Sequence, residues 1–535
     1  MSKKQRPTIV PQPRRFPPVT FAVLSGLLLG AAFPPIDCKW LVWIGLVPLL
    51  FVILQNPSSG SVFLYGYIAG FVFFLMNLHP LVSAHSWTGW AAESTQAFAR
   101  RMTQQWWFMQ GIWMGFALWC AVWCGVWALL LKQLSKGHGW RMLVLAPVLW
   151  VVGPEWIRSH TTFGFAWGFL GNATADLMLV RQLAALGGVW LLSALVVVVN
   201  VGIANTLLKP STASRQQVSM ASAFLLVAAS LFGIARLRQR SSPGQALLTA
   251  VLQRAKPSYT TEDFARPTGF DRGYVPMIEQ ALAKKAQLIM LPESIALGTM
   301  TLDASASSTK PVQWQHARAA WEAQMAMLLK ENPATIIVGL DTVEHGEDHN
   351  TLVAWNKNKT LGWYHKRRLV PFAEYQPWVW APWAIHGKSE YSPGNGSQLI
   401  KLSQEVVLGG FICQEVLFPW VVRNSVRDGA TVLVSGGNDG VFGDPAVALV
   451  HADAAQIRAV ETGRFIVRAM KTGISQVLDP FGQELVRSRS AEPVLLMETI
   501  VPQSGLTPYI RYGNWVVYLS FLLILVYGIV LPQKK

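Results

Sequence analysis

The segment LGGFICQE, residues 408–415, is a short apolar run that ends in a cysteine and two polar residues. Runs of about four to eight apolar residues are typical of buried strands in layered α/β domains. In such domains ligands commonly bind beyond the ends of the strands, which is where Cys413 lies. The segment therefore predicts an α/β domain with a candidate nucleophile at the end of one strand.

Similar runs recur throughout the region from 245 to 508, with helical patterns between several of them. We expect this region to form one α/β layered domain. The expected strands are Ala246–Leu252, Leu288–Leu291, Thr335–Leu340, Val406–Ile412, Thr431–Ser435 and Phe465–Ala469, and the expected helices are Gly273–Lys285 and His316–Glu331.

The rest of the chain has the composition of a membrane protein. Of the 535 residues, 52% are hydrophobic and 14% are charged, whereas soluble domains carry about a quarter charged residues. We expect a membrane domain at 1–240 with about seven transmembrane helices, and a C-terminal helix with a short tail at 509–535. The candidate spans are Val19–Pro35, Leu41–Gln55, Val62–Val82, Trp106–Lys132, Trp140–Trp156, Leu183–Leu208, Gln217–Leu237 and Tyr512–Leu531.

Positive charge near the two termini predicts their location. Five lysines and arginines precede the first apolar run, and Lys534 and Lys535 follow the last one. The positive-inside rule then places both termini in the cytoplasm and the α/β domain outside it, in the periplasm of a cell whose inner (plasma) membrane holds the helices. Arg236, Arg238 and Arg240 fall on the outer side and weigh against this topology. Because many basic residues have this role, the net charge of +16 does not predict nucleic-acid binding.

The cysteines and histidines predict no disulfide framework and no metal site. Cys413 is the only one of the four cysteines in the α/β region, and the others lie in or beside apolar runs. His85, His160 and His451 do not form a clustered ligand set in the sequence. We expect neither a metal nor a cofactor.

Three polar residues lie at the ends of expected strands, one of them within a basic segment. Glu293 comes after LIMLP at 288–292, Lys366 lies in YHKRR at 364–368, and Cys413 ends its own strand. A thiol needs a base to become a nucleophile, and an acyl carbonyl needs a positive donor for its developing oxyanion. Singly, the cysteine reads as buried core and the lysine as a solvated side chain. Together, the three provide a nucleophile, a base and an oxyanion donor.

The neighbourhoods of these residues carry a family resemblance. LPES at 291–294, KRRLVPFAEY at 366–375 and ICQE at 412–415 resemble the carbon-nitrogen hydrolase (nitrilase) superfamily. Other segments resemble one membrane-bound branch of it, the apolipoprotein N-acyltransferase family. These segments are AFPP at 32–35, PVLW at 147–150, EWIR at 155–158, GFAW at 164–167, LGGVWLLS at 186–193, RAVETGR at 458–464, TGIS at 472–475 and DPFG at 479–482.

The resemblance implies a fold and a set of roles. The fold would be a polytopic membrane domain of about eight helices that holds an α-β-β-α sandwich outside the cytoplasm. Glu293 would be the general base, Lys366 the oxyanion donor and Cys413 the nucleophile. Glu374 and Glu415 would orient the lysine and shape the pocket.

The resemblance also implies an activity and its partners. The cysteine would take an acyl chain from a phospholipid, typically phosphatidylethanolamine, as a thioester. It would then pass the chain to the α-amine of the N-terminal diacylglyceryl cysteine of an apolipoprotein. The partners would be this donor, this acceptor and membrane lipids, without nucleic acid, and family analogy suggests a monomer.

Two departures from the family pattern keep other functions open. Gln414 stands where the family usually has tyrosine, and GGNDGVF at 436–442 stands where it has SNDAWF. One alternative is a membrane-anchored amidase or hydrolase of the nitrilase family. Another is an accessory nitrilase-like protein of conjugative transfer.

Overall fold

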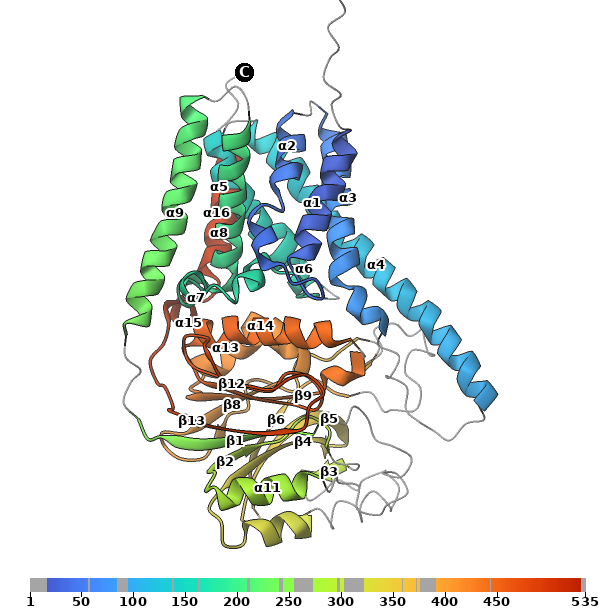
Figure 1. Cartoon of the computed structure of the whole chain (residues 1–535), viewed down its shortest axis with the longest axis vertical. Coiled ribbons are helices and arrows are strands. Elements are labelled where there is room, and N and C mark those ends of the chain that lie inside the picture. The colour runs from blue at the N-terminus through green and yellow to red at the C-terminus, as the bar shows by residue number, and fades with distance from the viewer. Residues whose placement is uncertain are drawn as a thin grey trace, which may run out of the picture.

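The structure is a computed structural model with two parts (Figure 1). Apolar helices form one end of the molecule, and an α/β domain forms the other. The description covers residues 17–55, 58–83, 95–136, 139–161, 164–208, 212–239, 244–254, 273–295, 299–302, 322–357, 359–371, 373–375, 391–442 and 444–530.

Each predicted span corresponds to an apolar helix among the described residues. Five of these helices are long and apolar enough to cross a membrane, and three are shorter. The long ones are α3 (Ser59–Asn77), α4 (Thr95–Ser135, apolar from Trp106), α5 with its continuation to His160 (Gly139–His160), α8 (Ala184–Leu207) and α9 (Ala213–Leu237); the shorter ones are α1 (Pro18–Ala31), Lys39–Gln55 with α2 (Val47–Gln55), and Trp515–Gly528 with α16 (Trp515–Leu525).

Small residues allow α3 and α4 to pack closely. A Cβ on Gly66 would lie 2.5 Å from the Ala128 Cβ, and one on Gly70 would lie 2.6 Å from the Cys124 Cβ. Glycines four residues apart on one face let apolar helices approach each other in this way. Cys124 is thus a packing residue of the helical part, as its apolar surroundings in the sequence indicate.

Two sheets make up the α/β domain. The first has the order β13-β1-β2-β4-β5-β6 with β3 beside β4, and the second has the order β12-β11-β10-β9-β8-β7. The central strands β1, β2 and β4, and likewise β8, β9 and β10, run parallel. The strands are β1 (Leu247–Gln253), β2 (Leu288–Met290), β3 (Thr299–Thr301), β4 (Thr335–Glu344), β5 (Glu347–Asn356), β6 (Lys359–His365), β7 (Ile400–Lys401), β8 (Val407–Ile412), β9 (Val432–Gly437), β10 (Ile466–Met470), β11 (Gln476–Leu478), β12 (Glu484–Arg487) and β13 (Val494–Ile500).

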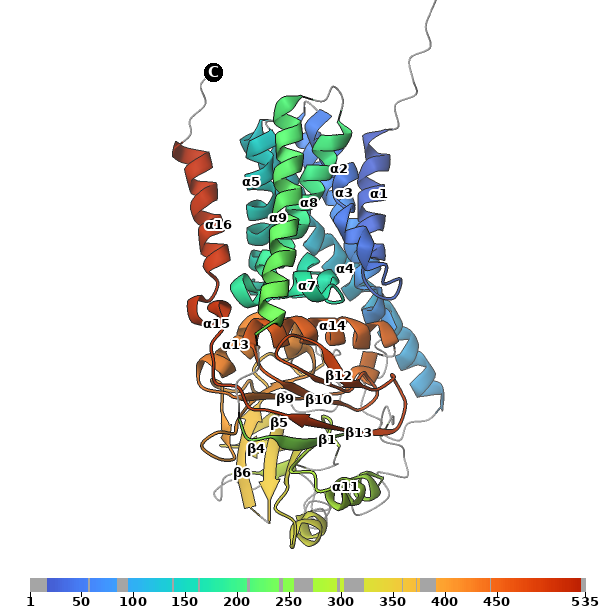
Figure 2. The same ribbon diagram turned by 60° about the vertical axis from the view of Figure 1, so that its left-hand side comes forward.

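The sheets lie between two helical layers (Figures 1 and 2). On β1, Ala250 and Leu252 pack with α11 (Tyr274–Ala283), whereas Val251 belongs to the core shared with the second sheet. Covering on both faces explains why these strands are apolar throughout. On the other side, α13 (Pro419–Arg427) and α14 (Pro445–Thr462) lie between the second sheet and the apolar helices. The predicted α-β-β-α sandwich is therefore confirmed.

All six expected strands are present, with ends shifted by a few residues. The expected helix Gly273–Lys285 is α11, and the described part of His316–Glu331 is helical at 322–329. Sequence patterns missed the antiparallel strands that extend each sheet. The start of β5 is polar, for example, yet this strand pairs with β4 from Glu347 to Trp355.

Polar contacts fasten α14 to the helical part. The Lys39 ammonium lies 2.8 Å from the Asp453 carboxylate, and the Val189 N–H donates to Glu461 at 2.7 Å. Arg236 lies at the same junction, where its Nε donates to the Gln182 side chain at 3.2 Å and its guanidinium lies over the ring of Phe481 at 5.6 Å. Contact with the α/β domain therefore accounts for an arginine that weighs against the predicted topology. The Arg181 guanidinium adds a hydrogen bond to the Gln456 side chain of α14 at 2.8 Å.

Candidate active site

The three residues predicted as a catalytic group lie just beyond strand ends. Glu293 follows β2 by three residues, Lys366 directly follows β6, and Cys413 directly follows β8. Cys413 has a φ of 53°, in the left-handed region that residues other than glycine rarely adopt. Such backbone conformations persist where the surrounding structure fixes them, and they cluster at functional sites.

A buried polar cluster surrounds the Lys366 ammonium. Its Nζ lies 2.8 Å from Glu374 Oε1 and 3.5 Å from Glu293 Oε1. The Asn350 amide donates to the same two oxygens, at 2.8 Å and 2.6 Å. The structure thus brings together three predicted residues and adds Asn350, whose place on β5 gave no signal in the sequence. The ammonium and the amide hold the two carboxylates in one place.

Glu415 connects the end of the nucleophile strand to the lysine loop. Its Oε2 accepts from the Ile412 N–H at 2.7 Å and from the Tyr364 hydroxyl at 2.8 Å. Its Oε1 accepts from the backbone N–H groups of Arg367 and Arg368 at 2.8 Å and 2.9 Å. A fully buried carboxylate with four donors is a strong anchor, because hydrogen bonds to a charged group are stronger than neutral ones.

Glycines allow the backbones of the site to approach one another. A Cβ on Gly339 of β4 would lie 2.5 Å from Glu293 Cα. A Cβ on Gly437 of β9 would lie 3.3 Å from Cys413 Cα and closer still to the Met470 side chain. The first glycine has backbone as its neighbour, which cannot move aside without moving the base.

Burial sets the resting protonation of the thiol. It raises the pKa of Cys413 well above the ordinary value, Glu293 raises it further, and Lys366 opposes the rise. Burial alone would lower the pKa of Lys366, but Glu374 and Glu293 outweigh it and raise that pKa above its usual range. The site therefore holds a neutral thiol beside a charged ammonium, and a base must remove the thiol proton before attack.

Cys413 also belongs to a second buried cluster, with Asp439 and His451. No pattern in the sequence indicated that His451 has such neighbours. Donor atoms of Cys413, Asp439 and His451 all lie within 4.8 Å of one another. His451 Nδ1 and Asp439 Oδ1 are 2.7 Å apart, and Arg468 donates to the other carboxylate oxygen at 3.3 Å. Burial would raise the pKa of Asp439, but His451 and Arg468 more than offset it and hold the pKa below its usual range. These residues belong to separate elements, so sequence spacing could not join them.

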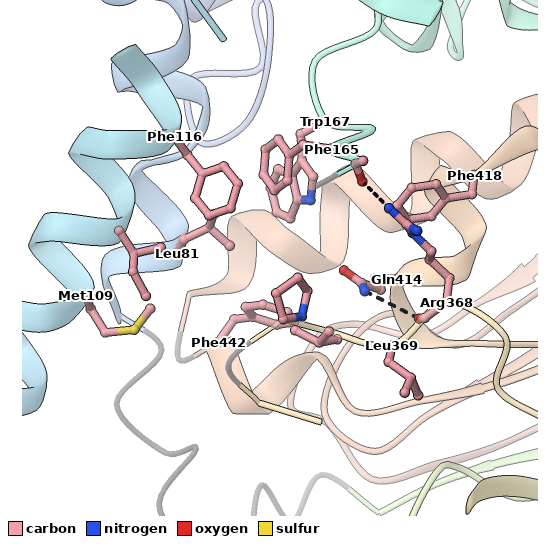
Figure 3. Close-up of a pocket in the computed structure, with 14 residues that line it drawn as sticks. Leu81, Met109, Phe116, Phe165, Trp167, Arg368, Leu369, Gln414, Phe418 and Phe442 are labelled. Carbon is pink, nitrogen blue, oxygen red and sulfur yellow. Dashed lines mark hydrogen bonds between the residues drawn. The ribbon is translucent and has the colours of Figure 1, made fainter. Parts of the chain in front are cut away.

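A pocket opens beside this site, between the apolar helices and the α/β domain (Figure 3). Gln414, the residue after the nucleophile, lines it, and its amide donates to the Arg368 carbonyl at 3.5 Å. Both parts of the chain build the walls, and most of the lining is apolar. The lining residues are Leu81, Met109, Ile112, Phe116, Gly164, Phe165, Trp167, Arg368, Leu369, Val370, Pro371, Gln414, Phe418 and Phe442.

Known proteins match both parts of the chain. A family model described as Apolipoprotein N-acyltransferase N-terminal domain matches residues 25–202, and one described as Carbon-nitrogen hydrolase matches residues 269–503. The apolipoprotein N-acyltransferase of Gloeobacter violaceus is 30% identical over 527 residues, which cover 94% of this chain and 92% of the relative. The chain belongs to the apolipoprotein N-acyltransferase family. The apolipoprotein N-acyltransferase of Caulobacter vibrioides is 28% identical, with 96% of this chain and 94% of the relative covered.

A solved structure, that of a nitrilase-superfamily amidase from Nesterenkonia AN1, matches about half of this chain. It is 19% identical, with 53% of this chain and 100% of the amidase covered and a TM-score of 0.37. Membership of the N-acyltransferase family rests on the family models and the full-length relatives. Those relatives span both parts of the chain, so helices and sandwich form one family architecture.

Proposed function

We propose that this protein, an enzyme that N-acylates lipoproteins, works through a thioester on Cys413 with Glu293 as base and Lys366 as oxyanion donor. One observation carries the proposal. The buried Glu293–Lys366 pair and Cys413 lie beside an apolar pocket that the helices and the α/β domain build together. Substrates with long acyl chains can reach such a site from the lipid phase.

In the first half-reaction, Glu293 takes the proton of the Cys413 thiol. The sulfur attacks the ester carbonyl of a phospholipid, the C–S bond forms, and Lys366 stabilises the oxyanion. The bond between the carbonyl carbon and the glycerol oxygen then breaks, and Glu293 returns the proton to that oxygen. Glu374 and Asn350 act as positioning residues, because their hydrogen bonds hold the Lys366 and Glu293 side chains in place.

In the second half-reaction, the α-amine of the lipoprotein's N-terminal cysteine attacks the thioester. The C–N bond forms, the C–S bond breaks, and the sulfur leaves as a thiolate. Glu293 takes a proton from the nitrogen and can restore the thiol. The same base serves both half-reactions because both acyl transfers occur at one carbon beside one sulfur.

We place the protein in the inner membrane with the α/β domain in the periplasm. Basic residues cluster near both termini. The start of α1 and the end of α16 lie at the end of the helical part that is farther from the α/β domain (Figures 1 and 2). All the proposed catalytic groups come from one chain, which supports a monomer as the working unit.

Intact mass of the detergent-purified protein tests the proposal. After incubation with phosphatidylethanolamine we expect a mass increase of one acyl group, absent from Cys413→Ser, that a diacylated lipopeptide removes by becoming N-acylated. If the adduct is lost to water alone, the protein is a hydrolase instead. If no adduct forms and Cys413→Ala still supports growth in place of the wild type, the accessory role applies.

A further inference from the structure

The pocket contains one charged side chain among the described residues that line it, that of Arg368 (Figure 3). Apolar and aromatic groups from both parts of the chain make up most of the other walls. Burial lowers the pKa of the Arg368 guanidinium, and Tyr375 opposes this effect. A guanidinium stays protonated even so, which makes this pocket an apolar site with a permanent positive charge.

Arg368 has few partners for its donors. Its Nη2 donates to the Gly164 carbonyl at 3.1 Å, and its guanidinium lies over the ring of Phe418, 5.0 Å from the centroid. Within the described part of the chain no carboxylate forms an ion pair with it. A guanidinium carries five N–H donors, and a planar fork of this kind suits bidentate binding of phosphate or carboxylate.

The loop from the helical part fixes this arginine in place. Gly164 has a φ of 23°, which residues other than glycine rarely adopt, and its carbonyl accepts the hydrogen bond from Arg368 Nη2. The Gln414 amide donates to the Arg368 carbonyl, so the arginine backbone contacts the residue that directly follows the nucleophile.

We infer that Arg368 binds the phosphodiester of the phospholipid that donates the acyl chain. This inference rests on the proposed function and identifies the Arg368 guanidinium as the group that selects the phospholipid donor. A phospholipid carries its negative phosphate on the same glycerol as the ester to be cleaved, so an anion held at Arg368 brings that ester toward Cys413. The diacylglyceryl group of the lipoprotein acceptor carries no phosphate, so Arg368 makes no matching contact with it. The arginine thus favours the donor over the acceptor in the first half-reaction.

Hexadecyl phosphate provides a test, because it has the chain and the phosphate of a donor but no ester to cleave. Its inhibition of thioester formation from phosphatidylethanolamine is measured by intact mass for wild type, Arg368→Gln and Arg368→Lys. Hexadecanol, which lacks the charge, is the control competitor. We expect the concentration for half-inhibition by hexadecyl phosphate to rise about 10- to 100-fold in Arg368→Gln, as for loss of a charge-assisted contact. Arg368→Lys keeps the charge but lacks the planar fork of donors. Its concentration for half-inhibition should lie between those of the wild type and Arg368→Gln.

The outcomes separate this inference from the proposed function. Without any thioester in the wild type, the proposed function fails. If the thioester forms but hexadecyl phosphate inhibits wild type and Arg368→Gln equally, or no better than hexadecanol, Arg368 does not bind phosphate. If Arg368→Gln does not fold, Arg368→Lys provides the test. Weaker inhibition of this variant by hexadecyl phosphate would support binding of the phosphate by the guanidinium. Inhibition equal to that of the wild type would show that the guanidinium fork does not bind the phosphate.

Discussion

The carboxylate of Glu415 accepts a hydrogen bond from the backbone N–H of Ile412 at 2.7 Å, directly before the nucleophile. The same carboxylate holds the loop after Lys366. We expect Glu415→Gln to slow both half-reactions by at least about 100-fold. An amide has one acceptor oxygen in place of two, and each lost hydrogen bond to the charged group costs about 1.5–3 kcal/mol. Thioester formation and discharge, timed separately by mass, check this. Glu405→Gln, an exposed position, should match the wild type.

Lys366 should also control the reactivity of the thiol. Because the ammonium opposes the rise in the Cys413 pKa, Lys366→Met removes that effect and raises the pKa further. We expect iodoacetamide to alkylate Cys413 more slowly at pH 8 in this variant, with no acyl thioester formed from phospholipid. Lys401→Met, an exposed charge, is the control. Equal alkylation rates in the two variants would contradict an electrostatic effect of the Lys366 ammonium on the Cys413 thiol.

Gly339→Ala tests the close approach behind Glu293. The new methyl would lie 2.5 Å from Glu293 Cα, so the base must shift, and we expect about 10- to 100-fold slower thioester formation with a loss of about 1–3 kcal/mol in stability. Gly362→Ala on β6 is a matched control, because its Cβ would meet only Ile400 at 3.5 Å. A tolerated Gly339→Ala would mean that β4 does not fix the position of Glu293.

His365 should make the α/β domain sensitive to acid. Burial and the stacked ring of His349 lower its pKa to about 4, whereas the unfolded value is about 6.5. Between these values the unfolded chain binds a proton that the folded chain does not, so this contribution to stability is present above pH 6.5 and lost as pH falls toward 4. We expect the Tm of the wild type to drop more between pH 6.5 and 5 than that of His365→Gln. His345→Asn, on the exposed turn after β4, should behave like the wild type.

Local patterns in the sequence predicted the apolar helices, the central parallel strands and the strand-end positions of Glu293, Lys366 and Cys413. Each of these depends on a short run of neighbouring residues. Asn350 and the Asp439–His451 pair were missed because their partners come from other elements. Antiparallel strands such as β5 were missed for a related reason, since their pairing partners, and not their own polarity, make them strands. The roles proposed for the site residues remain predictions until the variants are measured.

The α14 helix has solvent on almost none of its surface, since one side lies on a sheet and the other meets the apolar helices. The α/β domain is therefore not a detachable module. Cutting the chain before β1 and after β13 would uncover the alanine and valine side chains of α14 along with its buried ion-pairing groups. Such a fragment should aggregate, and an engineer who wants this chemistry in water would have to redesign that surface first.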